Sequence, residues 1–227
     1  DILEEITGNR VNYGMVTIGG ARRDISDDTR KNVLEMLDKI EKSMNVIKDI
    51  LLADKTVALR TQNVGVLTTE DALRIGAVGP HARASNLSID VRKDAPYSSY
   101  EDFAFNVAVW PSCDVFSRVV IRVLENFESI KIIRQALDQL PKGPINLGLS
   151  KLPKIPAGEF MVRYEAPRGQ LCYKVVSDGG DCNKRLSIHV PTFRNAPTVP
   201  TMLKGNSVAD AGLIIASIDP CFSCMDR

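Results

Sequence analysis

The sequence lacks the features that would point to a membrane, a nucleic acid or secretion. Its 29 basic and 28 acidic residues nearly cancel, so net charge creates no field that would attract nucleic acid or an anionic membrane. The longest apolar stretches, such as the one over residues 209–218, are too short to cross a bilayer. No basic segment followed by an apolar one opens the chain, as in a secretory signal. We therefore expect a globular protein that binds no nucleic acid and reaches a membrane only through partner subunits.

Cysteine and histidine are also scarce, with five and two residues respectively. Without a secretory signal, an odd number of scattered cysteines argues against a disulfide framework and favours reduced thiols in a cytosolic setting. His81 and His189 are too few for a metal site of their own. We expect His81, in the segment GPHARASN, to make a hydrogen bond from a loop to the core.

Two long amphipathic helices are predicted in residues 1–143. Apolar residues recur every three or four positions over Asp27–Ala53 and over 114–140, which is typical of helices that pack together as the frame of a bundle. Shorter helices are predicted at Thr69–Ile75 and 98–103. The first residues form the end of a helix that has no start signal, so we expect a chain whose N-terminal part is missing.

Residues 144–227 have a different character, because glycine, proline and short β-prone runs replace the helical period. The runs cover 160–164, 171–176 and 186–190, with a glycine turn at 179–180 before the third. A last helix is predicted over 207–218. The fold class is therefore mainly α with a small antiparallel β-sheet (α+β), in one domain with portions 1–143 and 144–227.

The segment IDPCFSCMDR places Cys221 and Cys224 in a C-x-x-C arrangement, which lets two thiolates converge on one soft metal ion. By itself the pair is ambiguous. A structural zinc site would need a second pair, and a thioredoxin-like motif would stand at the start of a helix after a strand rather than at the chain end. Two thiols without a metal are the plain alternative.

The surroundings of the pair make it more specific. Asp-Pro before Cys221 and Arg227 after Cys224 resemble the C-terminal signature of [NiFe] hydrogenase large subunits, D-P-C-x-x-C followed by His or Arg. The Arg is similar to the energy-converting, complex I-related branch of that family. EAPRG (165–169), GPHARASN (79–86), DVRKDAPYSSY (90–100) and the helix over 118–137 resemble both these hydrogenases and the hydrogenase-like subunit of respiratory complex I. That subunit has lost its metal-binding thiols, whereas this chain keeps Cys221 and Cys224.

The resemblance implies a Ni-Fe(CN)2(CO) centre and roles for particular residues. Cys221 would be a terminal nickel ligand and a proton carrier, because a thiolate on nickel can accept a proton when H2 is split. Cys224 would bridge nickel and iron. Arg168 would hold its guanidinium over the open side of the metals beside Pro167, or be an exposed arginine in a turn.

Three further residues have implied roles around the same centre. Asp219 would hold Arg168 through a charge-assisted hydrogen bond, or simply form an Asp-Pro turn. Pro191 and Thr192 would place a hydroxyl that donates to a cyanide ligand, although a structural threonine is the alternative.

The roles of Tyr173 and of one glycine-containing segment do not follow from the resemblance. Tyr173 stands where many hydrogenases have a histidine, so a supporting role for this position is in doubt. The segment VTIGGARRDI, with Gly19 and Gly20, resembles a loop near the quinone cavity of the complex I relative. It is either an interface loop toward the iron-sulfur small subunit or the membrane arm, or a plain β-turn with two solvated arginines.

The function implied is that of a catalytic large subunit of a membrane-associated [NiFe] hydrogenase, which reversibly reduces protons to H2. Electrons would come from ferredoxin through iron-sulfur clusters of a small subunit, and the complex would lie on the cytoplasmic face of the membrane. The family's second C-x-x-C and its proton-relaying glutamate belong to the missing N-terminal part, so we expect the chain alone to be inactive and to bind no cofactor. The alternatives are a metal-free, complex I-like electron-transfer subunit at a quinone site and a non-catalytic scaffold.

Overall fold

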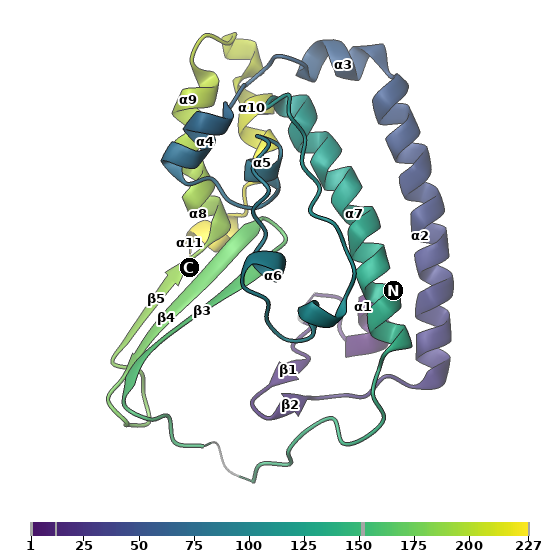
Figure 1. Cartoon of the computed structure of the whole chain (residues 1–227), viewed down its shortest axis with the longest axis vertical. Coiled ribbons are helices and arrows are strands. Elements are labelled where there is room, and N and C mark those ends of the chain that lie inside the picture. Colours follow the sequence, from purple (N-terminus) through teal and green to yellow (C-terminus); the bar gives the residue numbers. More distant parts are fainter. Residues whose placement is uncertain (1, 12, 151–152, 227) are drawn as a thin grey trace.

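Two long helices frame the molecule in the computed structural model, which describes residues 2–11, 13–150 and 153–226. Helix α2 (Asp27–Ala53) and helix α7 (Val115–Asp138) lie side by side (Figure 1). Ser26 caps α2 by accepting a hydrogen bond from the Thr29 amide, and Asp114 and Ser117 form a capping box on α7. Both predicted long helices are confirmed.

The contact between α2 and α7 is filled by some of the apolar residues whose spacing predicted the helices, whereas Ile40, Ile47 and Ile50 of α2 are 41%, 48% and 58% exposed. Because these residues recur every three or four positions, they form a stripe on each helix, and the two stripes meet. Two buried clusters result, one of Val33, Leu37, Ile130 and Leu137, the other of Leu51, Phe116, Val120 and Val123. The predicted bundle frame is therefore a packed core.

Short elements surround this frame in the first 110 residues. They are α1 (Ile2–Thr7), β1 (Val16–Thr17), β2 (Gly20–Ala21), α3 (Lys55–Thr61), α4 (Thr69–Ile75), α5 (Pro80–Arg83) and α6 (Val91–Asp94). Only α1 and α4 were predicted. The helix expected over 98–103 is a single 3-10 turn, Tyr100–Asp102, because Ser98 has a φ of 54°, which no helix accommodates.

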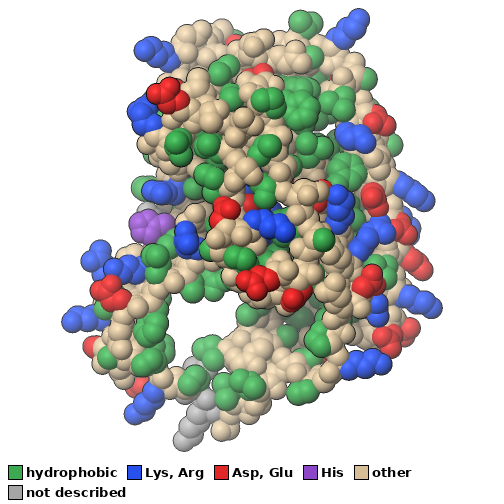
Figure 2. Space-filling model, in the orientation of Figure 1, with side chains coloured by type: hydrophobic (Ala, Val, Ile, Leu, Met, Phe, Trp, Pro, Cys, Tyr) green, Lys and Arg blue, Asp and Glu red, His purple; other side chains and the backbone are tan. Residues whose placement is uncertain are grey.

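The predicted sheet is confirmed as an antiparallel meander of β3 (Gly158–Ala166), β4 (Gly169–Ser177) and β5 (Arg185–His189). Residues paired across the strands share a face, so the register separates an apolar face from a polar one. The apolar face consists of Phe160, Val162, Tyr164, Leu171, Tyr173, Val175, Leu186 and Ile188. Figure 2 shows an open gap between the sheet and the rest of the molecule, with hydrophobic side chains along its sheet side.

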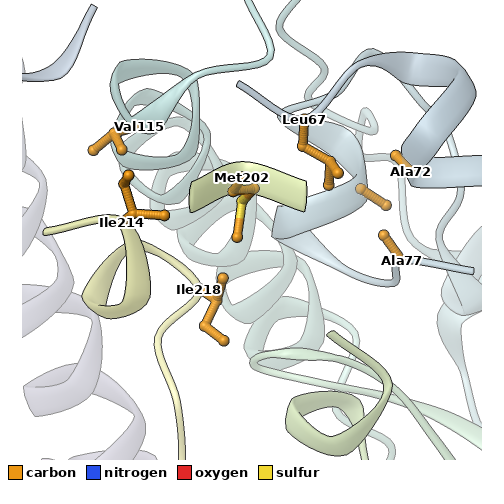
Figure 3. Close-up of a cluster of buried hydrophobic side chains, with 8 residues drawn as sticks. Leu67, Ala72, Ala77, Val115, Met202, Ile214 and Ile218 are labelled. Atoms are coloured by element: carbon orange, nitrogen blue, oxygen red, sulfur yellow. The ribbon is translucent and has the colours of Figure 1, made fainter. Parts of the chain in front are cut away.

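The chain after the sheet folds into short helical turns: α8 (Pro191–Asn195), η2 (Ala196–Thr198), α9 (Val199–Leu203), η3 (Val208–Asp210), α10 (Ala211–Ser217) and α11 (Phe222–Asp226). The helix predicted over 207–218 corresponds to α10 and begins later than predicted, because Ser207 caps a separate 3-10 turn. The helix α11 was not predicted. A third cluster joins Ile214 and Ile218 to Met202, Leu67 and Val115 (Figure 3). It fixes the end of α10, from which the Asp219-Pro220-Cys221 segment departs.

These elements make an α+β fold, as predicted. Within the part of the chain that the structure describes, no helix combines the length and apolar character needed to span a membrane. The division into portions 1–143 and 144–227 stays a prediction.

Candidate functional site

Arg168 lies in the tight turn between β3 and β4. The strands pair through to Ala166 and Gly169, so Pro167 and Arg168 alone make the turn. Gly169 has a φ of 125°, a conformation that favours glycine. The turn therefore projects the Arg168 side chain from the end of the sheet.

A close backbone contact fixes this turn against the start of α5. Gly79 has a φ of 68°, and a Cβ added to it would lie 2.3 Å from the Gly169 Cα. Only glycine allows the two backbones to approach so closely. The segments GPHARASN and EAPRG thus meet at their glycines.

Asp219 holds the Arg168 guanidinium in place. Arg168 Nε donates to the Asp219 carbonyl oxygen at 2.7 Å, and an Arg168 Nη donates to the Asp219 carboxylate at 3.1 Å. Asp219 has a φ of 55°, a left-handed conformation that aspartate tolerates better than most residues and that ends α10 before Pro220. The structure contains the expected contact between the two side chains; their role in catalysis stays a prediction.

Cys221 and Cys224 lie at the start of α11, close to Thr192 on α8. The Cys221 amide donates to the Thr192 hydroxyl at 3.3 Å, and the Cys221 Sγ lies 3.0 Å from the Ser223 hydroxyl. Thr192 is buried, and Pro191 begins α8 directly before it. The structure thus gathers the predicted site residues of three distant segments in one place; Arg227 lies outside the described residues.

The two thiols have different acidities. The pKa of Cys221 is lowered to about 7, chiefly by the hydrogen bond from Ser223 and then by Cys224, with a smaller contribution from Arg168. Burial raises the pKa of Cys224, and the neighbouring Cys221 adds to the rise. Cys221 is therefore the thiol that ionises first.

A cavity of about 260 Å³ is lined by Cys224 of the thiol pair. The turn residues Pro167 and Arg168 line one side, Pro191 and Cys224 another. The remaining wall includes Leu171, Tyr173 and Ile188, which belong to the apolar face of the sheet. An apolar wall beside a guanidinium strengthens electrostatic interactions there, because it keeps water away.

The donor set fits one half of a four-thiolate metal centre. Two thiols one helical turn apart, one of them easily ionised, suit a soft transition metal. Within the described residues, no three His, Cys, Asp or Glu side chains converge to complete a site. Cys113, Cys172 and Cys182 are free thiols elsewhere in the fold. The chemistry of the pair therefore fits a nickel-iron centre only if two further ligands are added to it.

The sequence analysis missed a buried charge network behind the Arg168 turn. Arg83, on α5, binds the carboxylates of Glu125 and Glu165, the latter at 2.9 Å, and lies 3.5 Å from Asp90. Arg92 binds Asp90 at 2.7 Å. The segments EAPRG, GPHARASN and DVRKDAPYSSY each contribute charged residues to this network. The sequence shows these charges, but only the folded structure shows that they lie together.

The remaining predicted positions have clear structural surroundings. His81 is buried, and its Nε2 lies 2.9 Å from the Thr198 hydroxyl, as expected for a bond from loop to core. Burial keeps the pKa of His81 well below its usual value. Gly19 lies in the β1–β2 turn, and Gly20 begins β2 and pairs with Asn146. The predicted interface role of this segment stays untested.

Comparison with known proteins finds one matching family and several relatives that align with the whole chain. The family described as the 49 kDa subunit of respiratory-chain NADH dehydrogenase matches residues 1–153 and 147–227. The carbon monoxide-induced hydrogenase of Rhodospirillum rubrum is 39% identical over the whole chain, which spans 63% of that protein. The alpha subunit of the Pyrococcus furiosus membrane-bound hydrogenase is also 39% identical over the whole chain, which spans 56% of it. A subunit of the NADH-quinone oxidoreductase of Clostridium beijerinckii is 37% identical over the whole chain, which spans 61% of it. The chain thus covers about three fifths of the length of these curated relatives.

Proposed function

Because the chain belongs to the family of the 49 kDa subunit of respiratory-chain NADH dehydrogenase, we propose that it forms the C-terminal part of the catalytic large subunit of an energy-converting [NiFe] hydrogenase. One observation carries the proposal: Cys224 and Arg168 line the same cavity, with Arg168 held by Asp219 and with Cys221 as the second thiol of the C-x-x-C pair. An electron-transfer subunit without metal has no need of two such thiols.

When bound, a nickel-iron centre would supply the cleavage and formation of H2. Cys221 would hold a proton at its Sγ, because a terminal thiolate keeps a lone pair that can accept one. Arg168, fixed by Asp219, would present a permanent positive charge toward the open side of the cavity. The apolar sheet wall would exclude water from this region.

The partners follow from the same proposal. Two further thiolates would come from the part of the longer subunit that this chain does not span. Electrons would arrive from ferredoxin through an iron-sulfur small subunit, and membrane-arm subunits would attach the complex to the cytoplasmic face of the membrane. The name of the Pyrococcus furiosus relative, a membrane-bound hydrogenase subunit, supports such an assembly.

Infrared spectroscopy of the intact, anaerobically purified complex tests the proposal. We expect the stretching bands of iron-bound cyanide and carbon monoxide, and we expect Cys224→Ser to abolish them. Cys182→Ser is the matched control, because Cys182 is an exposed thiol in the loop before β5. Well-folded wild-type protein without these bands would favour the metal-free, complex I-like electron-transfer subunit.

A further inference from the structure

A second cavity, of about 360 Å³, lies directly behind the cavity at the thiols. Both cavities are lined by Ala166 and Pro167, so only the turn carrying Arg168 separates them. Asp219 lines the second cavity while it holds Arg168 of the first. At about 30 Å³ per molecule, the second cavity has room for roughly ten waters.

The lining of this second cavity is polar and charged, unlike the apolar wall at the thiols. Arg83 and Arg122 contribute positive charge, while Glu125 and Glu165 contribute carboxylates. Ser129 and Asn126, both on α7, also line the cavity, and the exposed Asn126 connects its lining with solvent.

Glu165 is the most enclosed carboxylate of the lining, with 5% of its side chain exposed. Arg83, which is 2% exposed, is shared among three carboxylates, those of Asp90, Glu125 and Glu165. The charged and titratable groups that face Glu165 are Arg83 of α5, Asp90 and Arg92 at α6, Tyr97, whose hydroxyl accepts from the Glu165 amide, and Arg122 and Glu125 of α7.

Arg83 and Arg92, the two guanidiniums that form ion pairs here, share three carboxylates between them. Asp90, Glu125 and Glu165 carry three negative charges, whereas Arg83 and Arg92 carry two positive ones, and Arg122 has no carboxylate within ion-pair distance among the described residues. Burial raises the pKa of Glu165, so this residue binds a proton more readily than an exposed glutamate does.

We propose that the second cavity is a water-filled path for protons between the thiol site and solvent, and that Glu165 is its buried relay residue. The inference rests on the proposed function. A proton leaving the thiol side passes to cavity water beside Asp219 and then to the Glu165 carboxylate, which becomes neutral. Glu165 returns the proton to water on the side of Glu125, and the water releases it at the mouth near Asn126. Only a proton moves, and the Arg168–Asp219 pair stays ionised throughout.

The first test measures Glu165 directly and needs no metal. Infrared spectra of the subunit prepared without metal, taken across a pH titration, should show the carbonyl stretch of a buried carboxylic acid. Glu165→Gln should remove this band, whereas Glu159→Gln should leave it. Glu159 is a matched control, because it is an exposed glutamate on the same strand. A band unchanged in Glu165→Gln, or absent from the wild type, overturns the proposal.

The second test uses the intact complex and measures exchange of H2 with D2O. Glu165→Gln should slow exchange about tenfold or more, with the infrared bands of iron-bound cyanide unchanged. Ser129→Leu should also slow exchange, because the larger side chain fills part of the cavity without replacing a member of the Arg83 ion pairs. If Glu165→Gln fails to bind metal, Ser129→Leu tests the proton path in its place. Normal exchange in Ser129→Leu and in any metal-loaded Glu165→Gln overturns the relay. Absence of the cyanide bands from the wild type would instead refute the hydrogenase assignment, while the titration of Glu165 would still report on the cavity.

Discussion

The α2–α7 pair and the β3–β4–β5 sheet both have one apolar side, but they use it differently. Along the helix pair, residues such as Val33 and Leu37 are fully enclosed by the partner helix. On the sheet, Phe160 and Leu186 remain 44% and 49% exposed, although the register places them on one continuous apolar face. Where the two helices meet, their apolar side chains are buried, although Ile47 and Ile50 of α2 stay 48% and 58% exposed. On the apolar face of the sheet, by contrast, none of the described residues is buried.

The difference shows where the stability and the function of this chain reside. The helix pair is stabilised by burial of many apolar side chains, each contributing a moderate amount. The region that carries the thiols depends on a few specific contacts between distant segments, such as Gly79 with Gly169 and Arg168 with Asp219. Substitutions should therefore act through different mechanisms in the two regions.

The largest effect is expected at the backbone contact of the site region. Gly79→Ala would place a Cβ 2.3 Å from the Gly169 Cα at a φ of 68°, so the turn must move. We expect a loss of about 4 kcal/mol in the free energy of unfolding, measured by urea denaturation. Gly205→Ala is the control, because Gly205 has a φ of 80° with nothing within 4 Å, and strain alone should cost it about 1 kcal/mol. Equal losses in the two variants would show that the contact is unimportant.

A pair of leucine substitutions compares the two apolar surfaces directly. Leu37→Ala should lower the free energy of unfolding by about 3 kcal/mol, because it opens a cavity in the helix core. Leu186→Ala should cost less than about 1 kcal/mol, since its side chain is half exposed. The measurement is again urea denaturation. A large loss at Leu186 would mean that the sheet face is covered in solution, for example by self-association.

Arg118 joins the two regions, and its replacement should have an intermediate effect. This fully buried arginine on α7 donates to the Ser217 hydroxyl of α10 at 2.8 Å and to the Gly65 carbonyl at 2.7 Å. Arg118→Met would leave these acceptors without their donor, at a cost of about 2 kcal/mol. Arg134→Met, which removes exposed pairs with Asp38 and Glu41, should cost under about 1 kcal/mol and serves as the comparison in thermal unfolding.

The sequence predicted the helix pair more completely than the site. A regular spacing of apolar residues is a local property, so α2, α4 and the strands could be located from neighbouring residues alone. The helices α5 and α6 have four residues each and are held by ion pairs from Arg83 to Glu125 and Glu165. No local pattern encodes such contacts. The helix predicted over 98–103 was wrong because Ser98 has a left-handed φ. The rings of Tyr97 and Tyr100 pack there on each other and on Tyr164 and Phe105, contacts that no local pattern encodes.

The site itself was predicted in its parts rather than in its arrangement. The C-x-x-C pair and the Arg168–Asp219 contact followed from motifs, and the structure places these residues together. The charge network and the second cavity did not follow, because their members come from β3, α5, α6 and α7 and meet only in the folded chain.

The smallest predicted effect is a difference in the pH dependence of stability between the two regions. At the start of α3, amide hydrogen bonds from Val57 and then Thr56 lower the pKa of Asp54 from its ordinary value of 3.8, so its stabilising contribution is present above that value and is lost as the pH falls. Glu165 behaves oppositely, because burial raises its pKa from 4.5, so its contribution is present below that value and is lost as the pH rises. Urea midpoints measured between about pH 3 and pH 8 should therefore show Asp54→Asn approaching the wild type in acid. Glu165→Gln, which imitates the protonated acid, should gain on the wild type as the pH rises. Parallel curves for Glu165→Gln and the wild type would mean that Glu165 ionises like an exposed glutamate, and the distinction between the two regions would then rest on packing alone.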